Sequence, residues 1–417
     1  KRRRLIPETG ASSLRNPFAA WSPAVSPDGQ CLLFRMDKAS AVYSMNVVRV
    51  GGGEPREIAP PGERATSGAW TADGQEILYP SRVDGIYALR RVEASGGRSE
   101  PILQAGYDTY DPAVSRMGNR LAFVRRSSAA DLMKLDLGST RRAERIVAAA
   151  RTQTSPQFSP DGRKIAFASN HGGWEEIWVS DDQGHNLTQI TSFGSEGLVG
   201  TPRWSPGGDE IAFDGRKGNN CDIYVVNVAG GAPSRLTEDP AEDILPSYSH
   251  DGKWIYFASD RSGTFQIWRT SRQGGVATQV TRNGGVGPLE SGDGRFVYYF
   301  QPEKREIWRI PTTGGTEEAV VRDVRAWQEG TWRMYYGWWT ISGDAIYYIE
   351  EQKEGPHTRW ILNRLDPGTA VTSVPAQIDA RPLAPGGSIA VSPDGRTAVL
   401  VQATTTVSQI MLLENFR

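Results

Sequence analysis

Apolar and polar residues alternate in short runs along the whole chain, and turn residues separate these runs. Within residues 154–191, the runs Pro156–Ser159, Lys164–Ala168 and Glu176–Val179 are followed by a fourth, Leu187–Thr191. A Pro-Asp-Gly segment lies between the first two runs. Because proline fixes φ and glycine accepts a positive φ, this segment predicts a tight turn between two strands. Four short β-rich runs joined by turns predict one four-stranded antiparallel sheet.

The same pattern recurs nine times, with turn glycines about every 46 residues. Each turn has a Ser or Thr three residues before its Gly: Ser26/Gly29, Thr71/Gly74, Ser115/Gly118, Ser159/Gly162, Ser205/Gly208, Ser249/Gly252, Ser291/Gly294, Thr340/Gly343 and Ser392/Gly395. Five residues after each Gly comes a large apolar side chain, aromatic in eight of the nine repeats: Phe34, Tyr79, Phe123, Phe167, Phe213, Phe257, Tyr299, Tyr348 and Leu400. The repeat predicts an all-β protein. We expect one closed β-propeller of nine four-stranded blades, with eight as the alternative count, spanning 1–417 as a single domain.

The two ends of the chain predict how the ring closes. The last repeat contains the runs Ser388–Ser392, Thr397–Gln402 and Ser408–Glu414, and the sequence then stops one strand short of a blade. Leu5–Glu8 resembles the fourth runs of the other repeats. We therefore expect this segment to pair as the outer strand beside Gln409–Leu413, which would cover a sheet edge that is otherwise open to aggregation.

Composition narrows the possible partners. The chain has 47 basic and 48 acidic residues, so no overall charge favours nucleic acid. Its two cysteines, Cys31 and Cys221, lie in different repeats, and we expect two free thiols rather than a disulfide. There is no apolar run long enough to predict membrane insertion in this segment. Because the sequence begins with Lys1 rather than Met, we expect an upstream segment.

Repeats of the form S-P-D-G-x-x-I-A-F followed by I-W or I-Y, G-G and L-T, as in "SPGGDEIAFDGRKGNNCDIYVVNVAGGAPSRLT", resemble the TolB-type, WD-repeat-like bacterial β-propellers over essentially the whole chain. The nine repeats depart from the six blades of TolB itself. Two stretches, "QIMLLENFR" and "WWTISGDAIYYI", are similar to the C-terminal propeller half of acidobacterial proteins that carry an N-terminal winged-helix regulator or a protein kinase.

This resemblance implies the sensor or interaction domain of a larger membrane-anchored signalling or transcription-regulatory protein. It also implies an extracytoplasmic (periplasmic) location, with a tether upstream of this chain. The basic run Lys1–Arg4 argues the other way, because positive charge beside a membrane span marks the cytoplasmic side.

Sequence motifs for catalysis are weak. No Ser has Gly at both −2 and +2, so the nucleophile elbow of α/β-hydrolases is absent. The four histidines, His171, His185, His250 and His357, fall in different repeats without metal-ligand spacing. We expect a non-enzymatic protein without a cofactor or metal. The alternative is a metal-assisted lyase or hydrolase acting on a polysaccharide or peptide at the axial pocket, as in some pectate-type lyases with a similar propeller.

Candidate ligand-binding residues are those unlike their repeat equivalents near the channel mouth: Tyr107, Tyr110, Trp174, Arg203, Trp327 and Trp332. The counterparts of Arg203 are uncharged: Ala24, Ala69, Ala113, Gln157, Ser247 and Ala390. We expect Arg203 and the Trp327/Trp332 loop to flank a recess for a small polar ligand or the peptide end of a protein partner. The alternative is that Arg203 pairs with a carboxylate of an adjacent blade and that the tryptophans plug the channel, with Trp339 in the core. We expect a monomeric domain that does not bind nucleic acid directly.

Overall fold

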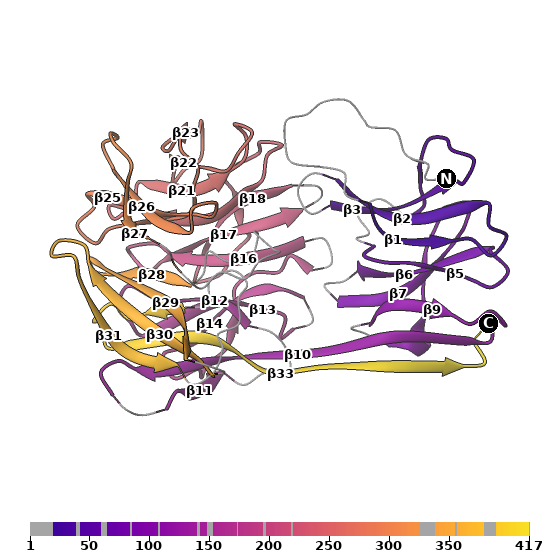
Figure 1. Cartoon of the computed structure of the whole chain (residues 1–417). Coiled ribbons are helices and arrows are strands. Elements are labelled where there is room, and N and C mark those ends of the chain that lie inside the picture. Colours follow the sequence, from indigo (N-terminus) through magenta and orange to yellow (C-terminus); the bar gives the residue numbers. More distant parts are fainter. Residues whose placement is uncertain are drawn as a thin grey trace. The chain divides into compact units, whose positions relative to one another are not determined.

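The computed structural model describes residues 20–416 apart from 39–41, 60–64, 84–85, 107–108, 140–141, 148–152, 173, 195–196, 218–219, 323, 325–337, 355–356 and 379–388. In these residues the chain is all-β, with one three-residue 3₁₀ helix, Leu103–Ala105 (Figure 1). The predicted fold class is therefore confirmed. Within the same residues, no helix is long and apolar enough to cross a bilayer.

Residue contacts group the chain into two compact units, whereas the sequence predicted one domain over 1–417. The first unit is Lys1–Ser127 with Thr406–Arg417, and the second is Ser128–Thr405. The unit boundaries fall inside two long strands, β10 (Arg120–Asp136) and β33 (Thr397–Glu414), so both strands contribute to both units.

Strands outside β10 and β33 are short. In the first unit they are β1 (Ala20–Val25), β2 (Cys31–Lys38), β3 (Val42–Arg49), β4 (Arg56–Glu57), β5 (Ala69–Trp70), β6 (Glu76–Val83), β7 (Ile86–Glu93), β8 (Glu100–Pro101) and β9 (Thr109–Val114). In the second unit they are β11 (Glu144–Val147), β12 (Gln153–Phe158), β13 (Lys164–Ser169), β14 (Glu176–Asp181), β15 (Thr188–Gln189), β16 (Gly197–Trp204), β17 (Glu210–Lys217), β18 (Cys221–Asn227), β19 (Ser234–Arg235), β20 (Asp243–Tyr248), β21 (Trp254–Ser259), β22 (Gln266–Ser271), β23 (Thr278–Gln279), β24 (Val286–Glu290), β25 (Phe296–Gln301), β26 (Glu306–Pro311), β27 (Glu318–Val321), β28 (Trp339–Ser342), β29 (Ala345–Glu354), β30 (His357–Asp366), β31 (Val371–Ile378) and β32 (Ile389–Val391).

The repeated turn has the predicted geometry. In residues 159–164, the Gly162 N–H donates to the Ser159 carbonyl at 2.8 Å, and Gly162 has φ of 72°. The Ser159 hydroxyl donates to Asp161 at 2.6 Å and accepts the Lys164 N–H at 2.9 Å. A Ser or Thr is therefore needed because its hydroxyl connects the turn to the start of the next strand. The aromatic residue five positions after the Gly is buried, as at Phe167.

The predicted number of nine blades is not confirmed, because the described strands form eight sheets. Seven are four-stranded and antiparallel. The third and ninth repeats share the remaining sheet, whose order is β11-β10-β33-β32 with β9 also paired to β10. Eight equals the alternative count, but through a sharing of strands that the sequence did not predict. Two strands alone form a marginal sheet, and the pairing of β32 and β33 with β10 and β11 removes that weakness.

Two predictions about the chain ends have different outcomes. The runs Thr397–Gln402 and Ser408–Glu414 are one continuous strand, β33, and not two. The neighbours of β33 in its sheet are β32 and β10. Leu5–Glu8 lies outside the described residues, so its pairing beside Gln409–Leu413 stays a prediction.

The second unit contains six sets of four strands that follow one another in space. Contacts join β12 to β16, β16 to β20 and β20 to β24, and β32 contacts both β28 and β12. The Gly292 N–H donates to the Gly343 carbonyl at 3.2 Å, which joins the β24–β25 turn to the β28–β29 turn. Each set of four strands therefore contacts the next, and the last contacts the first.

Candidate ligand-binding site

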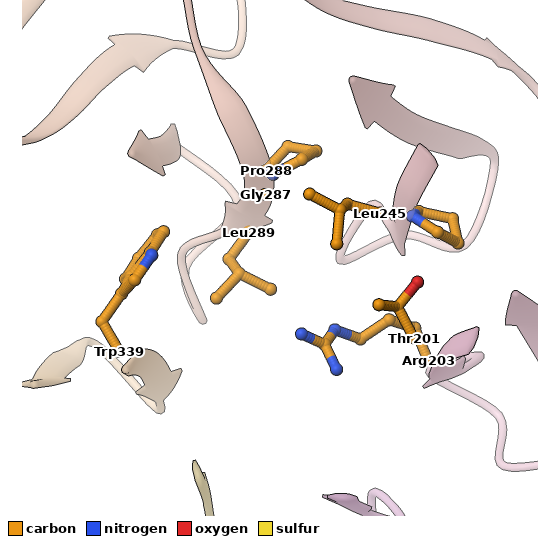
Figure 2. A pocket seen from close by; sticks show the side chains of 8 residues that line it. Thr201, Arg203, Leu245, Gly287, Pro288, Leu289 and Trp339 are labelled. Carbon is orange, nitrogen blue, oxygen red and sulfur yellow. The ribbon is translucent and has the colours of Figure 1, made fainter. Parts of the chain in front are cut away.

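A recess in the second unit lies between the first strands of four sheets. We call it the inner-strand pocket (Figure 2). Residues from β16, β20, β24 and β28 line it: Thr201, Arg203, Leu245, Pro246, Gly287, Pro288, Leu289 and Trp339. Because every contributing strand belongs to a different sheet, any group held there is contacted by several repeats at once.

The pocket wall is built from bulges in these first strands. Thr201 and Leu245 have φ of 43° and 58°, and each is followed by a proline. The pairing register shifts at both places, between Gly200 and Arg203 and between Ile244 and Ser247. A β-branched residue with positive φ is strained, and such strain persists only where the surroundings impose it. The bulges turn these residues towards the pocket.

Asp214 of β17 stabilises two of these strained residues. Its Oδ2 atom accepts the Thr201 hydroxyl at 2.6 Å and the Leu245 N–H at 2.9 Å. Asp214 is buried, and burial raises the pKa of its carboxyl, while the two hydrogen bonds and the positive charges of Arg216 and Arg203 act against that rise. One carboxylate thus connects the pocket segments of β16 and β20.

Arg203 points into the pocket, as Figure 2 shows. Its Nη1 donates to the Pro202 carbonyl at 3.2 Å. Among the described residues, no carboxylate lies within ion-pair distance of the guanidinium. Burial lowers the pKa of Arg203 to about 10, with the charge of Asp214 opposing this, so the side chain stays cationic at neutral pH. Most of its N–H donors are available to a ligand.

Trp339 supplies a second donor. The side chain is 4% exposed, and its Nε1 has no hydrogen-bond partner in the described part of the chain. Equivalent tryptophans elsewhere do have partners: Trp70 donates to the Ala24 carbonyl at 3.1 Å and Trp204 to the Gln157 carbonyl at 3.2 Å. Trp339 is buried in the core, as the alternative hypothesis predicted, and it also lines the pocket.

The other predicted site residues have separate positions. Tyr110 lies on β9 in the first unit and packs against Tyr87, with ring centroids 4.8 Å apart and the ring planes tilted by 41°. Trp174 is half-buried in the β13–β14 loop and does not line the pocket. Tyr107, Trp327 and Trp332 lie outside the described residues. Of the three predicted residues that the structure describes, only Arg203 lines the inner-strand pocket.

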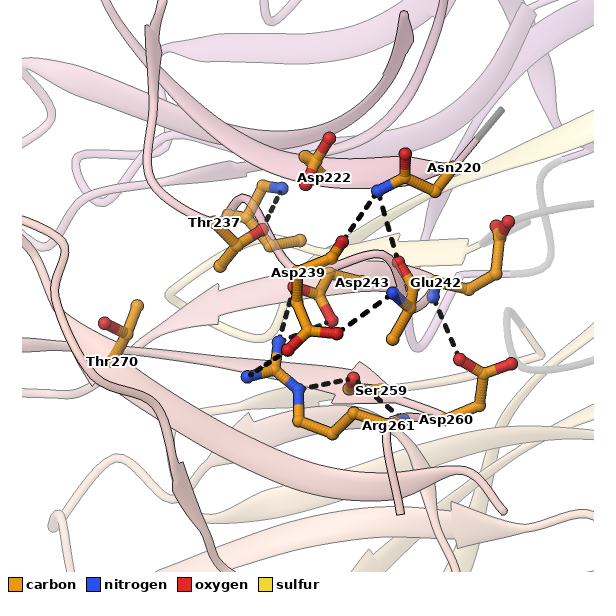
Figure 3. Close-up of polar contacts among 12 residues, drawn as sticks. Asn220, Asp222, Thr237, Asp239, Glu242, Asp243, Ser259, Asp260, Arg261 and Thr270 are labelled. Atoms are coloured by element: carbon orange, nitrogen blue, oxygen red, sulfur yellow. Dashed lines mark hydrogen bonds and ion pairs between the residues drawn. The ribbon is translucent and has the colours of Figure 1, made fainter. Parts of the chain in front are cut away.

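A second polar cluster surrounds the loop that leads from the sheet β16–β19 to the sheet β20–β23 (Figure 3). Arg261 donates to both oxygens of Asp243 at 2.9 and 2.7 Å. Arg235 donates to Asp222 Oδ2 at 2.6 Å, whereas Asp222 Oδ1 is buried and has no partner in the described part of the chain. Burial raises the pKa of Asp222 to about 6, although Arg235 opposes the rise. Each of these two ion pairs holds together strands or loops of one sheet.

In the described residues, no group of three His, Cys, Asp or Glu side chains is placed so that it could hold a metal ion. Cys31 and Cys221 are both free thiols. Burial raises the pKa of the Cys221 thiol, so it is not a reactive thiolate.

Comparison with known proteins identifies the family. A profile of the TolB beta propeller domain matches residues 8–192 and 142–326, which together cover most of the chain. The chain belongs to the TolB β-propeller domain family. A solved structure assigned as TolB from Agrobacterium tumefaciens has a TM-score of 0.53 at 19% identity, covering 67% of this chain and 99% of that one.

Sequence relatives of the TolB domain match over shorter stretches. An uncharacterized protein of Agrobacterium fabrum is 42% identical over 60 residues, 14% of this chain and 20% of the relative. The Tol-Pal system protein TolB of Bordetella pertussis is 45% identical over 56 residues, 13% of each chain. Because the matches span a fifth or less of these relatives, they support the repeat and the fold rather than a shared whole-protein activity.

Proposed function

We propose that this chain is a non-enzymatic binding module and that its second unit holds an acceptor-rich group at the inner-strand pocket. The group would belong to a small polar ligand or to the peptide end of a protein partner. The observation that carries this proposal is the pair of donors, Arg203 and Trp339, which line one recess while no carboxylate of the described residues pairs with the arginine. Buried donors without acceptors are costly, and a ligand oxygen would remove that cost.

The chemistry of the lining favours binding over catalysis. Besides the two donors, it consists of apolar side chains, prolines, a glycine and the Thr201 hydroxyl, which already donates to Asp214. A general acid or base must reach the reacting atoms with a group that titrates near the working pH. The guanidinium and the indole serve instead to orient an oxygen acceptor.

Small probes would test the binding site directly. N-acetylglycine and N-acetylglycinamide have nearly the same size, but only the first carries a carboxylate. We expect the first to shift the Trp339 indole 1H–15N resonance and the second to leave it unchanged. The substitution Arg203→Met should abolish the shift while preserving the circular dichroism spectrum. Equal responses to both probes, or an unchanged response in Arg203→Met, would refute the proposal.

The wider context is also a proposal. We infer that the module is the sensor or interaction domain of a larger membrane-anchored protein, held outside the cytoplasm by an upstream tether. The resemblance to propellers fused to regulators supports this role, and the run Lys1–Arg4 opposes the location. A periplasm-active reporter fused after Arg417 in the full-length gene should be active. A well-expressed but inactive fusion would overturn the assignment.

A further inference from the structure

Three neighbouring residues make the sheet β16–β19 different from its repeats. Gly200, Arg203 and Asp214 occupy positions where the sheet β20–β23 has Ile244, Ser247 and Ala258, and where the sheet β12–β15 has Thr154, Gln157 and Ala168. The strand pairing places Gly200 opposite Asp214, and a Cβ atom on Gly200 would lie 2.9 Å from Asp214 Oδ1. The missing side chain of Gly200 therefore makes room for the carboxylate.

The carboxylate and the guanidinium belong to one electrostatic unit. Asp214 and Arg203 attract each other, although no direct ion pair joins them. Arg216, the other cation that acts on Asp214, already forms an ion pair with Glu242. The negative charge of Asp214, which lies behind the pocket wall, largely balances the positive charge of Arg203. Little net positive charge is therefore left for a ligand.

The geometry points to a ligand with a single carboxylate group, and we propose that Asp214 sets this selectivity against phosphate. The inference rests on the binding role proposed above. A carboxylate brings one negative charge and two oxygens, which suit the guanidinium fork and the Trp339 N–H. A phosphate dianion brings a second negative charge that Asp214 repels, and no further cation among the described residues lines the pocket. Asp214 is a positioning residue, because it acts through Thr201, Leu245 and Arg203.

The experiment compares acetate with inorganic phosphate as probes of the full chain. At pH 8, where phosphate is mostly a dianion, the Trp339 indole resonance is followed during each titration at constant ionic strength. We expect wild type to bind acetate about fivefold more tightly than phosphate. Asp214→Asn keeps the shape and an oxygen for Thr201 or Leu245 but removes the charge, and it should reverse or abolish this preference.

A matched control separates the local effect from a general loss of charge. Asp222→Asn removes a buried carboxylate from the same sheet without altering the pocket lining, so the acetate-to-phosphate ratio should stay that of wild type. A ratio unchanged in Asp214→Asn, or changed equally in Asp222→Asn, would overturn the role of Asp214. Should Asp214→Asn not fold, the wild-type ratio remains decisive, since tighter binding of phosphate contradicts the proposal. If neither probe shifts the resonance, the proposed binding function itself fails.

Discussion

The sheets β16–β19 and β20–β23 share one backbone pattern and differ in what they bury. Both have a bulged first strand with a left-handed residue before a proline, Thr201 in one and Leu245 in the other. In the first sheet the bulge is accompanied by Asp214, whereas the equivalent Ala258 of the second sheet packs among apolar residues. Asp214 nevertheless contacts both bulges, because it accepts the Thr201 hydroxyl and the Leu245 N–H. The two sheets therefore differ in that one of them supplies the single carboxylate on which both bulges and the pocket wall depend.

Their third strands differ in the same way. Gln266 Oε1 accepts the Thr281 hydroxyl at 3.0 Å and the Gly284 N–H at 2.9 Å. The equivalent residue Asp222 has a shorter side chain, and its Oδ1 lacks a donor in the described part of the chain. The buried Oδ1 of Asp222 therefore carries a cost that the paired Oε1 of Gln266 does not.

The largest expected effect comes from placing a buried carboxylate, like that of Asp214, in the sheet β20–β23. Ala258 is fully buried opposite Ile244, which fills the space that Gly200 leaves free in the other sheet. We expect Ala258→Asp to lower the free energy of unfolding by about 3 to 5 kcal/mol, because the new carboxylate would be buried without a partner. Urea denaturation measures this. Ala258→Asn separates the effect of size from that of charge, and a cost below about 1 kcal/mol for Ala258→Asp would contradict the comparison.

A smaller effect is expected from filling the space beside Asp214. Gly200→Ala puts a methyl group against the Asp214 carboxylate, and we expect a loss of about 2 to 3 kcal/mol. The same change in an Asp214→Ala background should cost much less, because the carboxylate that it meets is gone. A double-mutant cycle gives the coupling between the two sites. Additive losses would mean that Gly200 is needed for another reason.

The sequence predicted the repeated parts of this molecule better than its exceptions. Turn glycines such as Gly162 and buried aromatics such as Phe167 recur at fixed spacing, and they perform the same task in most repeats. Arg203 was found as a departure from its uncharged equivalents. Asp214 was missed, although the same comparison of repeats, applied to the second strand, would have found an acidic residue where the other repeats have apolar residues or, in the first repeat, Arg35.

The shared sheet of β10 and β33 could not be predicted from repeat counting. A repeat count assigns four strands to each turn, whereas pairing depends on which edges remain free in space. One local signal was present. Neither Arg120–Asp136 nor Thr397–Glu414 contains a Gly or Pro, so nothing in either stretch ends a strand. The unpaired Trp339 indole was also beyond sequence, because Trp339 differs from the equivalent Trp70 and Trp204 only in lacking an acceptor for its Nε1.

The unpaired oxygen of Asp222 predicts a pH dependence of stability. Its pKa is raised from 3.8 to about 6, so the folded protein binds a proton there that the unfolded chain releases between these values. The resulting stabilisation is present at pH 4 and is lost as the pH rises through about 6. We expect wild type to lose about 1 to 2 kcal/mol relative to Asp222→Asn between pH 4 and pH 7.

The control for this pH effect is Glu176→Gln in the sheet β12–β15. Glu176 occupies the same position, and its two oxygens accept the Thr191 hydroxyl at 2.5 Å and the Gly194 N–H at 2.8 Å. Thermal or urea unfolding across the pH range compares the two pairs of proteins. A difference between wild type and Asp222→Asn that stays constant with pH would show that Asp222 does not take up this proton.

The smallest expected effect is at the exposed turns of the same two sheets. In the sheet β20–β23, Asp251 accepts the Ser249 hydroxyl at 2.7 Å and the Lys253 N–H at 3.1 Å. The other sheet has Gly207 at this place, and Asp209 accepts the Ser205 hydroxyl at 2.7 Å instead.

In each turn the Ser hydroxyl thus donates to an Asp, but the Asp occupies a different position. Exchanging the two arrangements should change the stability little. We expect Gly207→Asp with Asp209→Lys to alter the free energy of unfolding by no more than about 0.5 kcal/mol, because both sites are exposed and the exchanged surface ion pairs contribute little. Gly207 has no positive φ, so a side chain there causes no backbone strain. Urea denaturation of this variant and of Ala258→Asp would allow their losses of unfolding free energy to be compared directly. A turn exchange as costly as the buried one would mean that the sheets differ throughout and not only around the pocket.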